Sequence, residues 1–259
     1  MHFRSHLDRD RAAGERRGGA GRLRRRAGSG GAGRSRFQPL DVHGNFEALK
    51  EVLRKIDNLN ISEIFCLGDV VGYYSQVNEC CNELRKRNVK CVMGNHDWYM
   101  VANSFCQRSQ SVNDCLKYHR QIITKENKNW LASFPVIRNE YGISMVHGSW
   151  TNPIDDYFEP NEKYFEKING NYFISGHCHF QRLEIYKNKI YCNPGSVGQP
   201  RDNNNKAAFA TFDGKNFKLH RVEYNIEKVG KLMEKAGFNG YYYGCLYTGN
   251  NKLCWRNNV

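Results

Sequence analysis

The stretch EIFCLGDVVGYYSQVNEC, residues 63–80, combines a strand, a turn and the start of a helix. Its first five residues are mostly apolar, as in a buried strand, and Gly68 ends that strand directly before Asp69. Apolar side chains then recur at helical spacing, at Val77, Cys80, Cys81 and Leu84. A buried strand that ends at a carboxylate and leads into a helix indicates a layered α/β fold.

The same kinds of element continue on both sides of this stretch. Upstream, a helix is predicted from Asn45, with apolar residues at Phe46, Leu49, Val52, Leu53 and Ile56. Downstream we expect a strand at 90–93 and a mostly helical segment at 109–133, before Pro135. Six β-rich segments follow between Gly, Asn and Asp turns, at 143–146, 172–175, 183–186, 189–192, 207–212 and 217–222. We therefore expect one globular domain, residues 37–259, with sheets inside and helices outside.

The first 36 residues differ in composition from the rest. They contain eleven arginines, no lysine and three acidic residues, so +8 of the formal net charge of +13 lies here and +5 lies on residues 37–259. Such an Arg/Gly-rich segment cannot bury enough apolar surface to offset its ordering entropy, so residues 1–36 are expected to be a disordered leader. The alternative is a leader that binds nucleic acid. That binding would be salt-sensitive and would disappear when residues 1–36 are deleted.

The sequence also indicates a compartment and a redox state. No apolar run approaches the roughly 18 residues that a membrane span needs, and the first thirty residues lack the apolar centre of a secretory signal. These features predict a cytoplasmic protein without a membrane partner. The ten cysteines include no Cys-x-x-Cys pair, and several lie in apolar stretches, so reduced core thiols are expected rather than disulfides.

Five polar motifs follow one another along the chain, four of them directly after apolar runs. They are Asp41-Val-His43, Gly68-Asp69, Gly94-Asn95-His96-Asp97, His147-Gly148 and Gly176-His177-Cys178-His179. Loops at one edge of a sheet converge, so residues far apart in sequence can meet there. Singly the motifs are weak, since a lone histidine is more often a core residue. Together their oxygen and nitrogen ligands suit Mn, Fe, Zn, Ni or Co.

The ordered series resembles the calcineurin-like metallophosphoesterase superfamily, whose pattern is D-x-H, G-D, G-N-H-[D/E], H and G-H-x-H. The stretches CLGDVVGYYSQVNEC, VHGS and NPGSVGQPRD, which start at residues 66, 146 and 193, resemble its small bacterial-type phosphodiesterase branch. The resemblance covers about residues 40–247 and implies a four-layer α/β/β/α sandwich. The protein serine/threonine phosphatases of the superfamily carry G-D-x-V-D-R-G and G-N-H-E. This chain has Val71-Gly72-Tyr73 and Asp97 there, which argues against a phosphoprotein phosphatase.

The resemblance implies a dinuclear metal centre. One divalent ion would be held by Asp41, His43 and His179, the other by Asn95, His147 and His177, and Asp69 would bridge them. Mn²⁺ is the first expectation for the cofactor, with Fe, Ni, Zn, Co and Mg as alternatives. In the family, a hydroxide between the two metals attacks phosphorus while both metals neutralise the phosphate charge.

Four further residues are expected near the substrate. The resemblance implies that His96 protonates the leaving group or stabilises charge, and that Asp97 orients the His96 ring. The alternative for Asp97 is a turn cap. Asn193 and Arg201, in the Gly- and Pro-containing loop that follows a strand, are candidate phosphate contacts. A simple surface ion pair is the alternative for Arg201.

Three other features are expected to be structural. Cys178 alternates with His177 and His179 and should point away from the metals. His2, His6, His119 and His220 match no motif. The tail from about residue 226 resembles the family's helical ending, and its tyrosines, residues 241–243, are expected to pack, with base stacking as the alternative.

The first motif lacks the apolar strand that the family places before it. Residues 34–40 read Arg-Ser-Arg-Phe-Gln-Pro-Leu, and proline removes a ladder hydrogen bond. We therefore expect Asp41 and His43 to be held loosely. Replacing residues 1–40 with Met and a short Val/Ile-rich strand ending in Ser should raise the melting temperature and the metal occupancy.

These observations predict a dinuclear metal-dependent phosphoesterase that hydrolyses small phosphodiesters or nucleotides. A dinucleoside polyphosphate hydrolase of the same superfamily is the alternative enzyme. A catalytically weak interaction module on the same fold is the alternative from another class of protein. The sequence leaves the natural substrate, the native metal and the oligomeric state open.

Overall fold

The computed structural model describes residues 39–250 except 60 and 62, and the side chains of residues 39 and 40 are not described. Three sheets contain ten strands within this part of the chain. A parallel sheet has the order β1-β2-β3, with β1 Pro39–Leu40, β2 Phe65–Cys66 and β3 Lys90–Cys91. An antiparallel pair consists of β9 Ala207–Phe212 and β10 Phe217–Val222.

The largest sheet is mixed and has the order β4-β5-β6-β8-β7. Its strands are β4 Ile137–Glu140, β5 Ile143–Val146, β6 Tyr172–Ser175, β7 Gln181–Tyr186 and β8 Lys189–Pro194. The three inner strands β5, β6 and β8 are mutually parallel, whereas the edge strands β4 and β7 pair antiparallel to their neighbours. The carboxyl ends of the inner strands therefore point to one edge of the sheet.

Nine helices lie in the described part of the chain. They are α1 Phe46–Asn58, α2 Val77–Lys86, α3 Asn95–Val101, α4 Gln110–Ile122, α5 Lys125–Ala132, α6 Glu162–Glu166, α7 Ile226–Lys235, α8 Gly240–Tyr243 and α9 Cys245–Thr248. The side chain of Asn45 caps α1 by accepting a hydrogen bond from the Ala48 N–H at 3.1 Å. The apolar face of α1, which includes Leu49 and Ile56, is buried. None of these helices is long and apolar enough to cross a bilayer.

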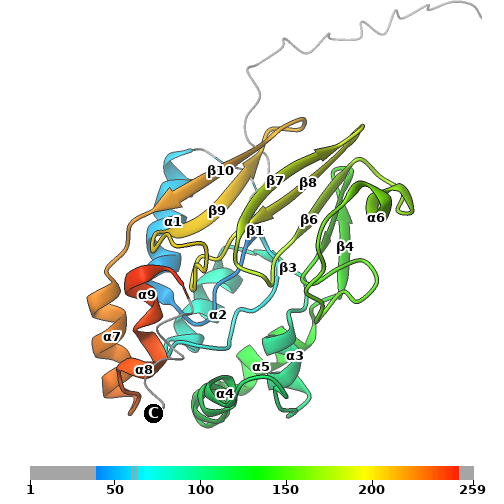
Figure 1. Cartoon of the computed structure of the whole chain (residues 1–259). Coiled ribbons are helices and arrows are strands. Elements are labelled where there is room, and N and C mark those ends of the chain that lie inside the picture. The colour runs from blue at the N-terminus through cyan, green and yellow to red at the C-terminus, as the bar shows by residue number, and fades with distance from the viewer. Residues whose placement is uncertain (1–38, 60, 62, 251–259) are drawn as a thin grey trace, which may run out of the picture. The chain divides into compact units, whose positions relative to one another are not determined.

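Three apolar clusters separate the layers. Neighbouring residues of a strand point to opposite faces, so Cys66 packs toward α1 and α2 while Phe65 packs between the sheets. In β6, Ile174 likewise joins the inter-sheet cluster and Phe173 packs outward against Phe165 of α6. The order is helices, sheet, sheet, helix, and Figure 1 shows α1 and α6 on opposite sides of the strands. The four-layer α/β/β/α arrangement is thus confirmed.

The residues before the first motif form a strand in spite of the proline. Pro39 pairs with Phe65 and Leu40 with Cys66, so the expectation that this segment cannot make a strand is wrong for these two residues. Residues 37 and 38 lie outside the described part. The turn that follows is fixed by the Val197 and Gly198 N–H groups, which donate to the Asp41 carbonyl at 2.8 and 3.1 Å. Asp41 and His43 are fully buried, and the loose hold that we expect for them stays a prediction.

Candidate metal centre

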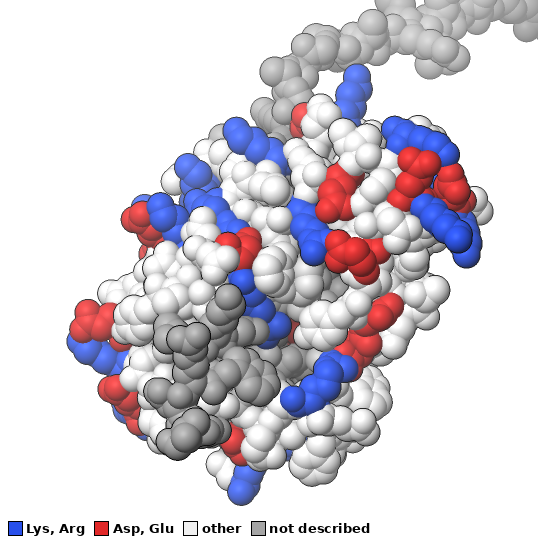
Figure 2. Space-filling model, viewed as in Figure 1, with Lys and Arg blue, Asp and Glu red and all other residues white. Residues whose placement is uncertain are grey.

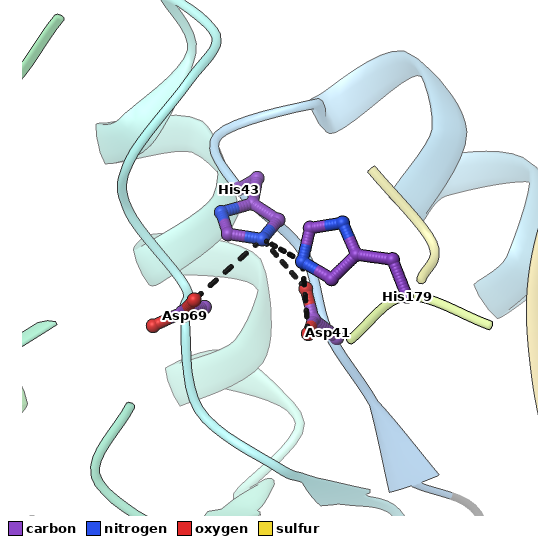
Figure 3. A group of neighbouring side chains, drawn as sticks. All are labelled: Asp41, His43, Asp69 and His179. Atoms are coloured by element: carbon purple, nitrogen blue, oxygen red, sulfur yellow. Dashed lines mark hydrogen bonds and ion pairs between the residues drawn. The ribbon is translucent and has the colours of Figure 1, made fainter. Parts of the chain in front are cut away.

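Four side chains from three separate turns meet in the first cluster (Figure 3). The His43 Nε2 lies 2.9 Å from Asp41 Oδ1, 2.8 Å from His179 Nε2 and 3.6 Å from Asp69 Oδ2. The His179 Nε2 lies 3.6 Å from Asp41 Oδ2. One ligand atom from each of the four residues lies within 4.8 Å of the others, and all four residues are buried. This is a compact N₂O₂ donor set.

The second cluster shares Asp69 with the first. The His147 Nε2 lies 3.2 Å from Asp69 Oδ2, 3.0 Å from Asn95 Oδ1 and 3.1 Å from His177 Nδ1. All four residues are buried. The seven residues expected as metal ligands are therefore brought together in two groups, and one carboxylate belongs to both.

The turns hold four of these residues in the left-handed region of backbone space. The φ angles are 54° at His43, 51° at Asp69, 65° at His177 and 63° at His179. Each non-glycine residue in this region costs on the order of 1–3 kcal/mol and persists only where its surroundings impose it. Here the His43 N–H donates to the Asp69 carbonyl at 2.6 Å and ties the first two turns together. Such strain is typical of functional sites.

Three of the imidazoles are oriented by backbone carbonyls. The Nδ1 atoms of His147 and His179 each lie 2.7 Å from a carbonyl oxygen, those of Leu67 and Gln199, and the Nδ1 of His43 lies 3.3 Å from the Val71 carbonyl. An Nδ1–H that donates to a carbonyl leaves Nε2 with a free lone pair. In all three rings Nε2 is the atom that faces the cluster, as ligation of a cation requires.

His177 has the opposite orientation. Its Nδ1 faces His147, and its Nε2 lies 3.3 Å from Asp155 Oδ1. Asp155 also accepts a hydrogen bond from the Tyr99 hydroxyl at 2.8 Å and pairs with Arg108. Asp155 was not predicted from the sequence because it belongs to none of the motifs and follows no predicted strand. Its place beside a ligand is visible only in three dimensions.

The charges in the clusters fit divalent cations. Burial alone would raise the pKa of Asp69, but its electrostatic interaction and hydrogen bond with His147 hold it well below its usual range, and the same carboxylate raises the pKa of His147 to about 9 against the effect of burial. A cation bound at this site would therefore displace a proton from His147. Burial and the charge of Arg201 hold the pKa of His179 well below its usual range. Asp41 Oδ2 is buried without a hydrogen-bond partner. The ionised Asp69 carboxylate, the neutral His179 imidazole and the unpartnered Asp41 oxygen are in states that suit a bound metal.

His96 lies beside the two clusters without belonging to either, and Asp97 does not contact its ring. The His96 Nε2 lies 3.9 Å from Asp69 Oδ2, and its buried Nδ1 has no hydrogen-bond partner. The Asp97 carboxylate instead accepts from the N–H groups of Val70, Val71 and Gly94, at 2.9, 3.2 and 3.2 Å. The expectation that Asp97 orients the His96 ring is therefore corrected: Asp97 joins the start of α3 to the turn that carries Asp69.

A cavity of about 480 Å³ opens beside the centre and is lined by Asn95, His96 and Arg201 among others. The Arg201 guanidinium donates to the Tyr73 hydroxyl at 2.7 Å and to Gln199 Oε1 at 2.8 Å. Within the described residues no carboxylate forms an ion pair with Arg201, so the surface ion pair is not observed. A guanidinium without a carboxylate partner, facing a cavity, suits an anionic ligand.

Asn193 does not line this cavity. Its side-chain nitrogen Nδ2 donates to the Gly176 carbonyl at 2.6 Å, and its side-chain oxygen Oδ1 accepts from the Gly195 N–H at 2.9 Å. The residue is fully buried. The expected substrate contact is therefore corrected to a structural one, because both ends of the side chain hold neighbouring loops.

The remaining histidines and cysteines stand outside both clusters. His119 is buried against the Tyr74 carbonyl, His220 stacks on Phe209, and His2 and His6 lie outside the described residues. Cys178 belongs to neither cluster, as expected. Nine cysteines are described, all as free thiols, and eight of them are buried, which confirms the prediction of core thiols for this part of the chain.

Comparison with known proteins agrees with this geometry. An uncharacterized protein of Methanocaldococcus jannaschii is 36% identical over an alignment of 220 residues, and the match covers 75% of this chain and 90% of that protein. A metallophosphoesterase from Sphaerobacter thermophilus superposes with a TM-score of 0.71 at 27% identity, covering 83% of this chain and 99% of that one. A symmetrical bis(5'-nucleosyl)-tetraphosphatase of Actinobacillus pleuropneumoniae is 28% identical over 116 residues.

That last match covers 41% of this chain and 42% of the tetraphosphatase, so it reflects part of each protein. A family description matches a larger share: the calcineurin-like phosphoesterase superfamily domain matches residues 40–216. This span contains all seven candidate ligands, His96 and Arg201. The chain belongs to the calcineurin-like phosphoesterase superfamily.

Proposed function

We propose that the chain is a dinuclear metal-dependent phosphoesterase that hydrolyses small phosphodiesters or nucleotides. The observation that carries the proposal is the sharing of Asp69 by two buried donor clusters. A carboxylate has two oxygens and can serve two cations while reducing their mutual repulsion. The donor set of oxygen and imidazole nitrogen atoms suits Mn²⁺ first, with other first-row divalent metals as alternatives.

When bound, two divalent cations supply charge neutralisation on the phosphate oxygens and a nucleophilic water at neutral pH. The protein's part begins with the ligands, since the carbonyl-bound Nδ1 atoms of His43, His147 and His179 fix which nitrogen faces the centre. Burial of the whole set excludes bulk water and strengthens every charge interaction within it.

Arg201 and His96 act on the substrate in this proposal. Arg201 binds a non-bridging phosphate oxygen, because its guanidinium lines the cavity without a carboxylate partner. Burial lowers the pKa of His96 to about 3, against the opposing charge of Asp69, so the free ring is neutral at pH 7. The neutral ring can donate one N–H hydrogen bond to the leaving oxygen. The negative charge of a bound phosphate favours protonation of the second ring nitrogen by solvent, and the imidazolium would then transfer a proton to the leaving oxygen and return to the neutral ring.

The first test is hydrolysis of bis(p-nitrophenyl) phosphate by the full-length chain, with Mn²⁺ and with a chelator. His96→Ala tests the residue at the cavity, and His220→Ala is a matched control outside it. We expect metal-dependent turnover that falls about 10²-fold to 10⁴-fold in His96→Ala, as for loss of a general acid, and persists in His220→Ala. Turnover that is equal in His96→Ala and the unmodified chain would refute the role of His96.

A dinucleoside polyphosphate hydrolase is the second candidate function. It is favoured by the similarity to the tetraphosphatase over 116 residues and by a cavity larger than a phosphate group needs. Incubation with diadenosine tetraphosphate and chromatography of the products tests it. Two ADP molecules per substrate would support this function, and an unchanged substrate in the presence of Mn²⁺ would exclude it.

The interaction module is the third reading of the site. It is disfavoured by the complete and buried ligand set, because a binding module has no need to hold four residues in strained backbone conformations. Absence of turnover on both substrates, with metal bound, would favour it.

A further inference from the structure

The cavity beside the metal centre extends well beyond the space for a phosphate. Its volume of about 480 Å³ lies within the roughly 300–1,000 Å³ of small-molecule sites. One part of its lining is formed by Asn95, His96 and Arg201 at the metal centre. Another part is formed by Tyr241 and Tyr242 of α8 and by the residues that open α4. The part of a substrate attached to the phosphate therefore has a defined place.

Tyrosine rings dominate the aromatic surface of this cavity. Tyr73 and Tyr157 line it together with the α8 pair. Tyr242 is fixed, because its hydroxyl donates to Asp114 of α4 at 2.9 Å and its ring packs 4.8 Å from that of Phe238. Tyr241 stands at 89° to Tyr242, and in the described structure its hydroxyl forms no hydrogen bond. The Tyr241 ring is thus held by a rigid neighbour and free to stack on a ligand.

The polar groups of the lining discriminate between ligand classes. The cavity contains two guanidinium groups, Arg108 and Arg201, and no carboxylate. A cationic head group such as choline also binds aromatic rings, but here it would meet the guanidinium of Arg201, which has no carboxylate partner among the described residues, whereas Arg108 is paired with Asp155. A neutral planar ring avoids that repulsion. Ser109, Gln110 and Ser111 offer hydroxyl and amide groups for its polar edge.

We propose that the α8 end of this cavity is a nucleobase subsite, with the base stacked on Tyr241 and the phosphate directed to Arg201 and the metal centre. The subsite narrows the substrate class of the proposed phosphoesterase to nucleotides, and to that extent rests on the proposed function. Base stacking on an aromatic side chain changes affinity by about 5-fold to 150-fold. It tolerates different bases because each has a π face.

The test compares AMP with ribose 5-phosphate, which differ only in the base. Both are titrated calorimetrically into the manganese-loaded full-length chain. If the protein hydrolyses AMP or ribose 5-phosphate during the titration, the two ligands are compared by their kcat/KM values instead of their affinities. We expect AMP to bind at least about fivefold more tightly, and Tyr241→Ala to bring the ratio close to one. Tyr241→Phe keeps the ring and should keep the ratio, whereas Tyr247→Ala removes an exposed ring outside the cavity and serves as the control.

Three outcomes would overturn the subsite. They are equal affinity for AMP and ribose 5-phosphate, an unchanged ratio in Tyr241→Ala with an unchanged melting temperature, and tighter binding of glycerophosphocholine than of AMP. Each is separate from failure of the proposed function. Turnover of bis(p-nitrophenyl) phosphate without preference for AMP would refute the nucleobase subsite but support the phosphoesterase function. Preference for AMP without any metal-dependent turnover would refute the phosphoesterase function but support the nucleobase subsite.

Discussion

Single residues around the metal centre act mainly by orienting other residues. The carbonyl groups that accept from His147 and His179 fix the ring nitrogens. The Asp155 carboxylate lies 3.3 Å from the His177 Nε2, close enough to attract that ring electrostatically, although this nitrogen makes no hydrogen bond in the described structure. Loss of a group that orients a metal-bound histidine typically weakens metal binding or activity 10-fold to 100-fold.

We therefore expect Asp155→Ala to weaken Mn²⁺ binding by about 10-fold to 100-fold, because the His177 ring loses the carboxylate at its Nε2. Asp155→Asn keeps an acceptor oxygen and should have a smaller effect. The measurement is a calorimetric titration with Mn²⁺, and Asp156→Asn is the neighbouring control, since Asp156 contacts Ser149 rather than a ligand. Equal affinities in Asp155→Ala and the unmodified chain would show that His177 needs no such support.

Asp97 contributes to stability in this structure. Its carboxylate accepts from three buried backbone N–H groups, and each such group left without a partner costs on the order of 1–3 kcal/mol. We expect Asp97→Ala to lower the free energy of unfolding by about 2–4 kcal/mol, measured by urea denaturation of the metal-free chain. An unchanged stability combined with a shifted pH–rate profile would instead restore the role beside His96.

At the scale of elements, the turns are held together by close approaches of their backbones. A Cβ at Gly198 would lie 1.9 Å from the Val42 carbonyl oxygen, between the two ligands of the first motif. The loop after β8 therefore packs directly against the turn after β1. Only glycine permits this contact.

Gly198→Ala should accordingly separate the two loops. We expect a loss of about 1–3 kcal/mol in stability, as for overpacking, and weaker Mn²⁺ binding, because Asp41 and His43 move with their turn. The control is Gly214→Val. At this turn an added Cβ meets nothing within 4 Å, but φ is +103°, so the variant introduces backbone strain without a steric clash. Similar losses of metal affinity in both variants would contradict the packing argument.

The first strand gives a second prediction at this scale. In the described part of the chain, β1 has two paired residues, and one of them is a proline, which has no N–H to donate. Replacing residues 1–40 with Met and a short Val/Ile-rich strand ending in Ser should raise the melting temperature and the metal occupancy. If neither the melting temperature nor the metal occupancy changes, the two strand pairs and the hydrogen bonds to the Asp41 carbonyl already hold the first motif in place.

Most elements could be predicted because their apolar period is regular. The spacing in α1 and α2 and the β-rich segments at 143–146, 172–175, 207–212 and 217–222 agree with the structure. The seven-residue helix α3 was missed, since it starts inside the Gly94-Asn95-His96-Asp97 motif and is too short to show a period. β4 was missed because it is an edge strand with exposed residues. The roles of Asp97 and Asn193 depend on which backbone groups face them, which no motif encodes.

At the scale of the whole molecule, charge is distributed without a dominant sign on the visible surface. Figure 2 shows Lys and Arg interspersed with Asp and Glu on this face. Residues 37–259 carry +5 of the total of +13. This face therefore offers no large basic patch to attract an anionic substrate, and local groups such as Arg201 would serve that purpose.

Stability of the whole molecule should depend on pH through His119. Burial lowers the pKa of His119 to about 3, although the Tyr74 carbonyl opposes this, whereas the unfolded value is about 6.5. Between these values the unfolded chain binds a proton that the folded chain does not, so stability falls as the pH is lowered. From pH 7.5 to pH 5 we expect His119 to account for a loss of about 2 kcal/mol.

Urea denaturation of the metal-free chain at both pH values measures this loss. His119→Gln keeps a side-chain donor for the Tyr74 carbonyl but does not titrate, so its stability should change less with pH than that of the unmodified chain. The same dependence on pH in both chains would show that His119 is not held neutral by burial.

The sharing of Asp69 by two donor clusters is the central claim, and the number of bound metal ions tests it most directly. The metal-free full-length chain is titrated with Mn²⁺, and bound ions per chain are counted by calorimetry and by elemental analysis after dialysis. We expect two ions per chain, with both sites weakened in Asp69→Ala because that carboxylate belongs to both clusters. A single ion, or two ions that Asp69→Ala leaves unaffected, would contradict it.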